Sequence, residues 1–136
     1  MDICTADILA SFALPVSEAG SSVSITLVCA YGGYERAFLK RMRRNSTRKK
    51  LVDRIVGGLV NVLGIIYTDF YFPTYTNGLK EISGVLGCTW SDEHASGIQS
   101  ILWRRHWETN RDEMWKALLT YNKEDCTALR TVTEFL

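Results

Sequence analysis

The chain has 136 residues, of which 46% are hydrophobic, so it forms one globular domain at most and is not intrinsically disordered. Its formal net charge is +1, and no stretch of about 18 apolar residues occurs, which argues against a membrane-spanning helix. No basic flank precedes an apolar run at the N-terminus, so we expect no signal peptide and a cytoplasmic protein. The four cysteines lie far apart without a Cys-x-x-Cys pair, which favours buried free thiols over a zinc site or a disulfide framework.

The first third of the chain predicts a helix, a loop, a strand, a turn and a second helix. Apolar spacing over residues 5–14, with Thr5 as a possible N-cap and Pro15 as a stop, predicts a short helix. Residues 23–30 are β-branched and apolar almost throughout, as expected for a strand that is covered on both faces. A glycine turn follows, and a helix is predicted over residues 34–42.

The turn Tyr31-Gly32-Gly33-Tyr34-Glu35 places an acid at the start of the second helix. With the strand before it, and Phe38 and Leu39 after it, this segment resembles the second motif of the DEDD-type 3′–5′ exonucleases of the ribonuclease H-like superfamily. In that motif an acid opens the helix after a central strand, so the resemblance implies that Glu35 binds a catalytic metal. The alternative is that Glu35 only complements the positive end of its helix dipole.

Seven basic residues crowd residues 40–50. A positive field of this density suits contacts to phosphates, although such runs also occur as solvated loops. As candidate nucleic-acid contacts we take all seven, namely Lys40, Arg41, Arg43, Arg44, Arg48, Lys49 and Lys50.

Residues 51–66 have a broad apolar face and predict one helix. An aromatic-rich loop follows, leading to a helix that Thr76 or Asn77 would cap. The string over residues 72–82 resembles a segment of the RecB-like putative nucleases that carry a YprB-type ribonuclease H-like domain. Tyr71 and Tyr75 would stack on unpaired bases if they face a basic groove, or else belong to the core.

The rest of the chain predicts helices. One covers residues 95–107, and another covers residues 110–120 and runs into a closing helix. In that closing helix Tyr121 and Asp125 are four residues apart and therefore share a face, which the apolar positions Leu118, Leu129 and Val132 turn toward the protein. A carboxylate on a core-facing stripe needs a partner or a metal.

The pair Tyr121 and Asp125 resembles the Tyr-x-x-x-Asp of the third exonuclease motif, and residues 121–126 resemble the ending of the RecB-like subgroup. The resemblance implies a ribonuclease H-like α/β domain over residues 1–136 that acts as a 3′–5′ exonuclease. It further implies that Glu35 and Asp125 bind Mg²⁺ or Mn²⁺, that Tyr121 orients the attacking water, and that the partner is single-stranded DNA or RNA.

The chain departs from this family at its N-terminus. The first motif, Asp-x-Glu on an opening strand, has no counterpart, because Asp2 is not followed by Glu two residues later. We therefore expect a partial fold that lacks the N-terminal β-meander, is mostly helical and keeps a short central sheet. Two alternatives follow for function: an exonuclease that a separate N-terminal nuclease fragment completes, or a catalytically inactive module that binds nucleic acid or protein.

Overall fold

Strand β2 (Ser24–Ala30) is the centre of the fold and has a neighbouring strand on each side. The computed structural model describes residues 10–15, 24–110 and 113–136. Within them, β1 (Ala10–Pro15) pairs with β2 in antiparallel orientation, and β3 (Leu59–Asn61) pairs with β2 in parallel orientation. The pairing of Cys29 with Val60 brings the end of β2 beside the end of β3. Since both strands end at the same edge, the turn after β2 lies close to the start of α3, which follows β3 directly.

Strand β1 differs from the sequence-based prediction of a helix over residues 5–14. Residues 10–14 are extended, and residues 5–9 lie outside the described part of the chain. The apolar residues Ala10, Phe12 and Leu14 alternate, which suits a strand as well as a short helix. All six residues of β1 have partners in β2, so pairing across the sheet outweighs the weak local preference for a helix.

The segment predicted as a single helix over residues 51–66 is broken into three elements. Helix α2 (Lys49–Gly58) ends at a glycine pair, β3 follows, and α3 (Val62–Asp69) begins directly after it. Gly57 and Gly58 weaken the helix at this point, while Leu59 and Val60 gain a partner strand. Helix α1 (Tyr34–Met42), by contrast, covers the residues that the sequence predicts.

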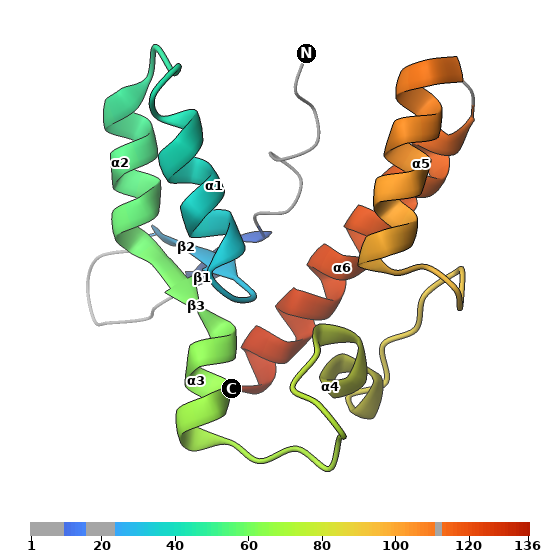
Figure 1. The fold of residues 1–136 in the computed structure, drawn as a ribbon. Coiled ribbons are helices and arrows are strands. Elements are labelled where there is room, and N and C mark those ends of the chain that lie inside the picture. Colours follow the sequence, from blue (N-terminus) through green and yellow to red (C-terminus); the bar gives the residue numbers. More distant parts are fainter. Residues whose placement is uncertain (1–9, 16–23, 111–112) are drawn as a thin grey trace.

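The remaining helices form the other half of the molecule (Figure 1). They are α4 (Leu79–Val85), α5 (Gly97–Asn110) and α6 (Met114–Phe135). Helix α6 packs against α4 and α5 and reaches the sheet, and the two predicted helices at the C-terminus form this one continuous helix. The cap of α4 is Gly78, and not Thr76 or Asn77, although the Thr76 hydroxyl still accepts a hydrogen bond from the Gly78 amide at 3.2 Å.

The main core lies between the sheet and the C-terminal half of α6. Its buried residues come from the sheet, α3, α4, α6 and the loop after α3: Cys29, Val62, Ile66, Phe72, Ile82, Leu129 and Val132. A second cluster joins Ala95, Trp103 and Tyr121 farther along α6. The architecture is thus mostly helical with a short central sheet, which is the fold class predicted from the sequence. No helix within the described ranges is both long and apolar enough to cross a membrane.

Candidate functional site

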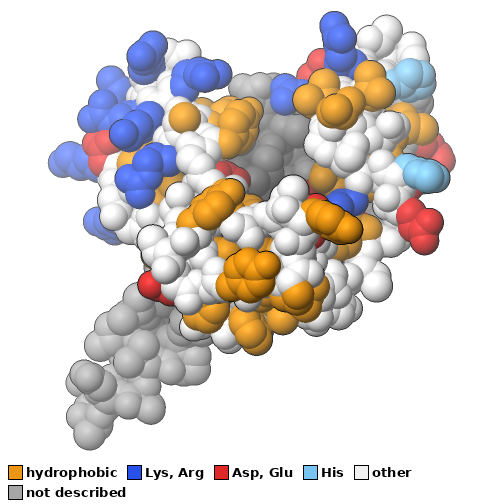
Figure 2. Space-filling view, turned by 60° about the horizontal axis from the view of Figure 1, so that its bottom comes forward, with side chains coloured by type: hydrophobic (Ala, Val, Ile, Leu, Met, Phe, Trp, Pro, Cys, Tyr) orange, Lys and Arg blue, Asp and Glu red, His pale blue; other side chains and the backbone are white. Residues whose placement is uncertain are grey.

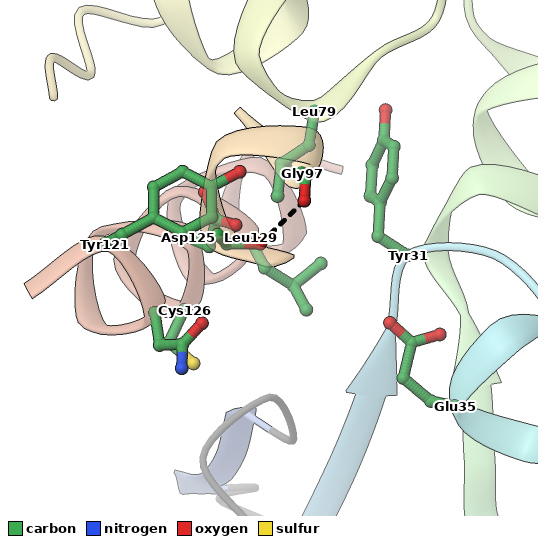
Figure 3. A pocket seen from close by; sticks show the side chains of 10 residues that line it. Tyr31, Glu35, Leu79, Gly97, Tyr121, Asp125, Cys126 and Leu129 are labelled. Carbon is green, nitrogen blue, oxygen red and sulfur yellow. Dashed lines mark hydrogen bonds between the residues drawn. The ribbon is translucent and has the colours of Figure 1, made fainter. Parts of the chain in front are cut away.

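A pocket of about 290 Å³ lies between the end of β2 and helix α6 (Figure 3). Glu35 lines it from α1, and Tyr121 and Asp125 line it from α6. The structure therefore brings together the three residues that the sequence nominates as catalytic. Glu35 belongs to the first third of the chain and Asp125 to its last helix, so the pocket depends on the tertiary fold.

On the β2 side, the glycine turn sets the position of Glu35. Gly32 has a φ of +115°, a conformation that favours glycine, and its amide donates a hydrogen bond to Asn61 Oδ1 at 3.0 Å. Asn61 also caps α3 through the Gly64 amide at 3.3 Å. Helix α1 starts directly after the turn, and its first residues carry Glu35 toward the pocket.

The Glu35 side chain is half-buried, and its Oε2 atom is buried without a hydrogen-bond partner among the described residues. A carboxylate in the first turn does complement the helix dipole, as the simpler interpretation of Glu35 requires. That interpretation does not account for a buried oxygen without a partner. A buried carboxylate oxygen without a partner, on a side chain that lines a pocket, is what a carboxylate that takes a cation as its partner would show.

On the α6 side, Asp125 is held by two neighbours. The indole Nε1 of Trp90 donates a hydrogen bond to Asp125 Oδ1 at 2.9 Å, and the Tyr121 hydroxyl lies near enough for hydrogen bonding to lower the pKa of Asp125. The Tyr121 ring is buried and meets Trp103 edge-on, with ring centroids 6.1 Å apart. These contacts fix both side chains of the predicted Tyr-x-x-x-Asp pair.

Burial dominates the electrostatics of the pocket. It raises the pKa of Asp125, whereas hydrogen bonds from Trp90 and Tyr121 and the positive charge of Lys80 act in the opposite direction. Burial, together with the charge of Asp125, raises the pKa of Tyr121 to about 12. Tyr31, whose hydroxyl donates to the Asn77 carbonyl at 2.6 Å, also has its pKa raised to about 12, chiefly by burial.

Two residues that contact the side chains of Tyr121 and Asp125 were not predicted from the sequence, namely Lys80 and Trp90. The Lys80 ammonium lies 4.9 Å from the ring centroid of Trp90 and 5.3 Å from that of Tyr121, and it donates to the carbonyl of Ala95. Lys80 stands within the string over residues 72–82 that resembles the RecB-like segment, which is a usable signal. Trp90 lies in an irregular connection without periodicity, where no local pattern identifies it.

The carboxylates in the pocket fit a hard divalent cation. Mg²⁺ is commonly bound through one or two carboxylates, with waters and substrate phosphates as the other ligands. Glu35 and Asp125 supply carboxylate oxygens, and Oε2 of Glu35 is free of protein partners within the described residues. In the described parts of the chain, however, no group of three or more His, Cys, Asp or Glu side chains is arranged to hold a metal ion.

The basic residues of the 40–50 run are all exposed, at the end of α1, in the following turn and at the start of α2. Figure 2 shows Lys and Arg side chains gathered on this side of the molecule. Arg43 pairs with Asp53, with Nη2 2.9 Å from Oδ2, so part of its charge is offset. The other six basic residues are Lys40, Arg41, Arg44, Arg48, Lys49 and Lys50.

Tyr71 and Tyr75 lie on the connection between α3 and α4 and are almost fully exposed, at 94% and 103% of the reference area. The alternative that they belong to the core is therefore wrong. Hydrophobic side chains also gather on the face of the molecule seen in Figure 2. Exposed tyrosines present flat rings on which unpaired bases stack.

One family model matches most of the chain, including the residues on both sides of the pocket. The family model RNase_H_2, described as RNase_H superfamily, matches residues 18–136. No curated protein and no solved structure matches the chain. The matched range includes Glu35, Tyr121 and Asp125.

Proposed function

Because this chain belongs to the RNase H superfamily, we propose that it is a metal-dependent 3′–5′ exonuclease acting on single-stranded nucleic acid. The observation that carries the proposal is the pocket that Glu35 lines from one side and Tyr121 and Asp125 line from the other. Within the superfamily, the strings over residues 72–82 and 121–126 favour the RecB-like subgroup with a YprB-type domain.

We assign a role to each of the three residues from the family resemblance, and their surroundings support it. Glu35 and Asp125 would hold Mg²⁺ or Mn²⁺ through carboxylate oxygens. Such a cation would lower the pKa of the attacking water and stabilise the negative charge on the phosphate. Tyr121, whose pKa is raised to about 12, keeps its proton near neutral pH, so its hydroxyl is available to orient the water.

We propose the nucleic-acid contacts from charge and exposure. The exposed basic residues at the α1–α2 turn would contact phosphates, and the rings of Tyr71 and Tyr75 would stack on bases. Neither type of contact reads sequence strongly, so we expect binding with little sequence preference.

The direct test is a nuclease assay on single-stranded DNA and RNA with Mn²⁺, in which the 5′ or the 3′ end carries the label. The parent is compared with Glu35→Gln, Asp125→Asn and Tyr121→Phe. As a matched control, Glu134→Gln removes an exposed carboxylate from the same helix as Asp125. We expect the two carboxylate variants to lose about 100-fold or more in rate, equivalent to about 2.7 kcal/mol of transition-state stabilisation.

The expected products from a 5′-labelled strand form a ladder that shortens from the 3′ end. Release of the 5′ label as a mononucleotide would contradict the proposed polarity. Equal cleavage by the parent and by Asp125→Asn would contradict the whole assignment of the site.

A second candidate is a catalytically inactive domain that binds nucleic acid. It is favoured by the lack of a third carboxylate in the pocket among the described residues. This candidate predicts salt-sensitive binding to single-stranded DNA without cleavage in Mg²⁺ or Mn²⁺. Each lost phosphate contact reduces the slope of log K against log salt by about 0.7.

The binding test uses the double variant Arg44→Gln/Lys49→Gln, which leaves the Arg43–Asp53 pair intact. We expect its salt slope to be lower than the parent's by about 1.4. Lys116→Gln, on the exposed surface of α6, is the control and should leave the slope unchanged. An unchanged slope in the double variant would remove the basic run from the binding surface.

A further inference from the structure

The connection between α4 and α5 contributes a residue that no motif identifies and that contacts Asp125, one of the residues lining the pocket. Trp90 lies in this connection and is half-buried. Its indole Nε1 donates to Asp125 Oδ1 at 2.9 Å, although 35 positions separate the two residues in the chain. An indole has one donor and no acceptor, so this contact uses its whole hydrogen-bonding capacity.

The next residue of the connection is fixed to the same helix. The Ser91 backbone amide donates to Glu124 Oε1 at 3.0 Å, and the Ser91 hydroxyl donates to the same oxygen. Two consecutive residues of the connection, Trp90 and Ser91, therefore bind two consecutive residues of α6, Asp125 and Glu124 respectively. This double attachment holds the connection against α6 at the turn that carries Asp125.

The indole ring is also held from its face. The ammonium of Lys80 lies 4.9 Å from the Trp90 ring centroid, within the range of a cation–π contact. Lys80 is itself tied to the carbonyl of Ala95, at the other end of the connection. The ring thus has one orientation fixed by its edge, at Asp125, and by its face, at Lys80.

We propose that Trp90 is a positioning residue that fixes the Asp125 carboxylate in the orientation required for binding a divalent cation, an inference that rests on the proposed function. The indole restrains one carboxylate oxygen, so rotation about the Asp125 side chain is limited. The carboxylate then faces the pocket that Glu35 lines from the opposite side (Figure 3). Hydrogen-bond partners of metal ligands commonly change metal affinity or activity about 10–100-fold when they are removed.

The first test measures Mn²⁺ affinity by electron paramagnetic resonance of the free ion, without any substrate. Trp90→Phe keeps an aromatic ring but removes the donor. The matched control is Trp107→Phe, which makes the same change at a ring of α5 that packs against Trp115 of α6. We expect Trp90→Phe to bind Mn²⁺ about 10–100-fold more weakly than the parent, and Trp107→Phe to bind as the parent does.

A second variant loosens the attachment without touching Trp90 or Asp125. Ser91→Ala removes the hydroxyl contact with Glu124, and we expect an intermediate loss of Mn²⁺ affinity. In nuclease assays, Trp90→Phe should lower kcat while leaving KM for the nucleic acid unchanged, because the contact acts on the carboxylate and not on the bound strand. A merely structural role would lower thermal stability without this division between kcat and KM.

The outcomes separate this inference from the proposed function. If Asp125→Asn binds Mn²⁺ as tightly as the parent, the metal site itself is wrong. If Asp125→Asn loses Mn²⁺ while folded Trp90→Phe keeps the parent's affinity, the site stands and the role of Trp90 is overturned. Should Trp90→Phe fail to fold, Ser91→Ala decides, and parent-like affinity in that variant overturns the proposal.

Discussion

Replacing Asn61 by alanine tests how the turn before Glu35 is held. The Asn61 side chain caps α3 through the Gly64 amide at 3.3 Å and accepts from the Gly32 amide at 3.0 Å. Loss of an N-cap costs about 1 kcal/mol, and because the bond to the Gly64 amide is the longer of the two, we expect its loss to cost about 0.5–1 kcal/mol. Loss of the second hydrogen bond adds about 1 kcal/mol. We therefore expect Asn61→Ala to lower the free energy of unfolding by about 1.5–2 kcal/mol.

Urea unfolding followed by circular dichroism measures this change. With an m-value of about 2 kcal/mol per molar urea, the midpoint should fall by about 0.8–1 M. Asn61→Asp is the control, because it keeps a side-chain oxygen that accepts both hydrogen bonds, and we expect it to unfold near the parent's midpoint. The reasoning is refuted if Asn61→Ala lies within about 0.5 kcal/mol of the parent, or if the Asp variant loses as much as the Ala variant.

Three other predictions concern the core and the buried ionisable groups. Ile66→Ala, at a fully buried position, should lower the free energy of unfolding by about 2–5 kcal/mol in the same urea experiment, whereas Ile98→Ala, at a position 76% exposed, should change it by less than about 0.5 kcal/mol. In the folded protein the pKa values of Tyr31 and Tyr121 are raised to about 12, above the ordinary value of 10.0. Because the unfolded chain loses these two protons at a lower pH than the folded protein does, the free energy of unfolding should fall as the pH rises from 10 through 12. Absorbance at 295 nm should therefore show a tyrosinate step near pH 12 that each Tyr→Phe variant reduces, and a step complete by pH 10 would contradict this. Because burial raises the pKa of Asp125, the charge of this group opposes folding above that pKa. At neutral pH in EDTA, the urea midpoint of Asp125→Asn should therefore equal or exceed that of the parent. A clearly lower midpoint would show that the ionised group stabilises the fold.

Local signals were enough to predict the elements around Glu35. The apolar run over residues 23–30 corresponds to β2 (Ser24–Ala30), and the helix predicted over residues 34–42 is α1. Both elements are marked by their own residues, a β-branched run and a glycine turn, and require no knowledge of distant partners. The same holds for the face of α6 that includes Leu129 and Val132, which is buried as the spacing predicts.

Elements that depend on distant pairing were not predicted. Strand β1 exists as the partner of β2, and β3 is a three-residue strand between two helices. Nothing in either segment alone distinguishes it from a short helix, because the free energy that decides between the two comes from the neighbouring strand. A helix predicted over residues 51–66 was wrong for this reason, together with the glycine pair that ends α2.

The candidate site likewise combines residues that local pattern and resemblance predict with a residue whose contact depends on the tertiary fold. Tyr121 and Asp125 share a face because of helix geometry, and the family resemblance nominates Glu35 as their companion. The contact of Trp90 with Asp125 depends on the path of the irregular connection between α4 and α5, which has no periodicity to read. The roles of the three nominated residues stay predictions until the variants are assayed.

The separation of Glu35 and Asp125 along the chain has a consequence during protein synthesis. A ribosome releases the N-terminal residues first, so β2 and α1 emerge long before α6, which contributes Tyr121 and Asp125. The two walls of the pocket meet only when α6 has left the exit tunnel and packed against the sheet. A nascent chain from which α6 has not yet emerged therefore has only the Glu35 wall of the pocket.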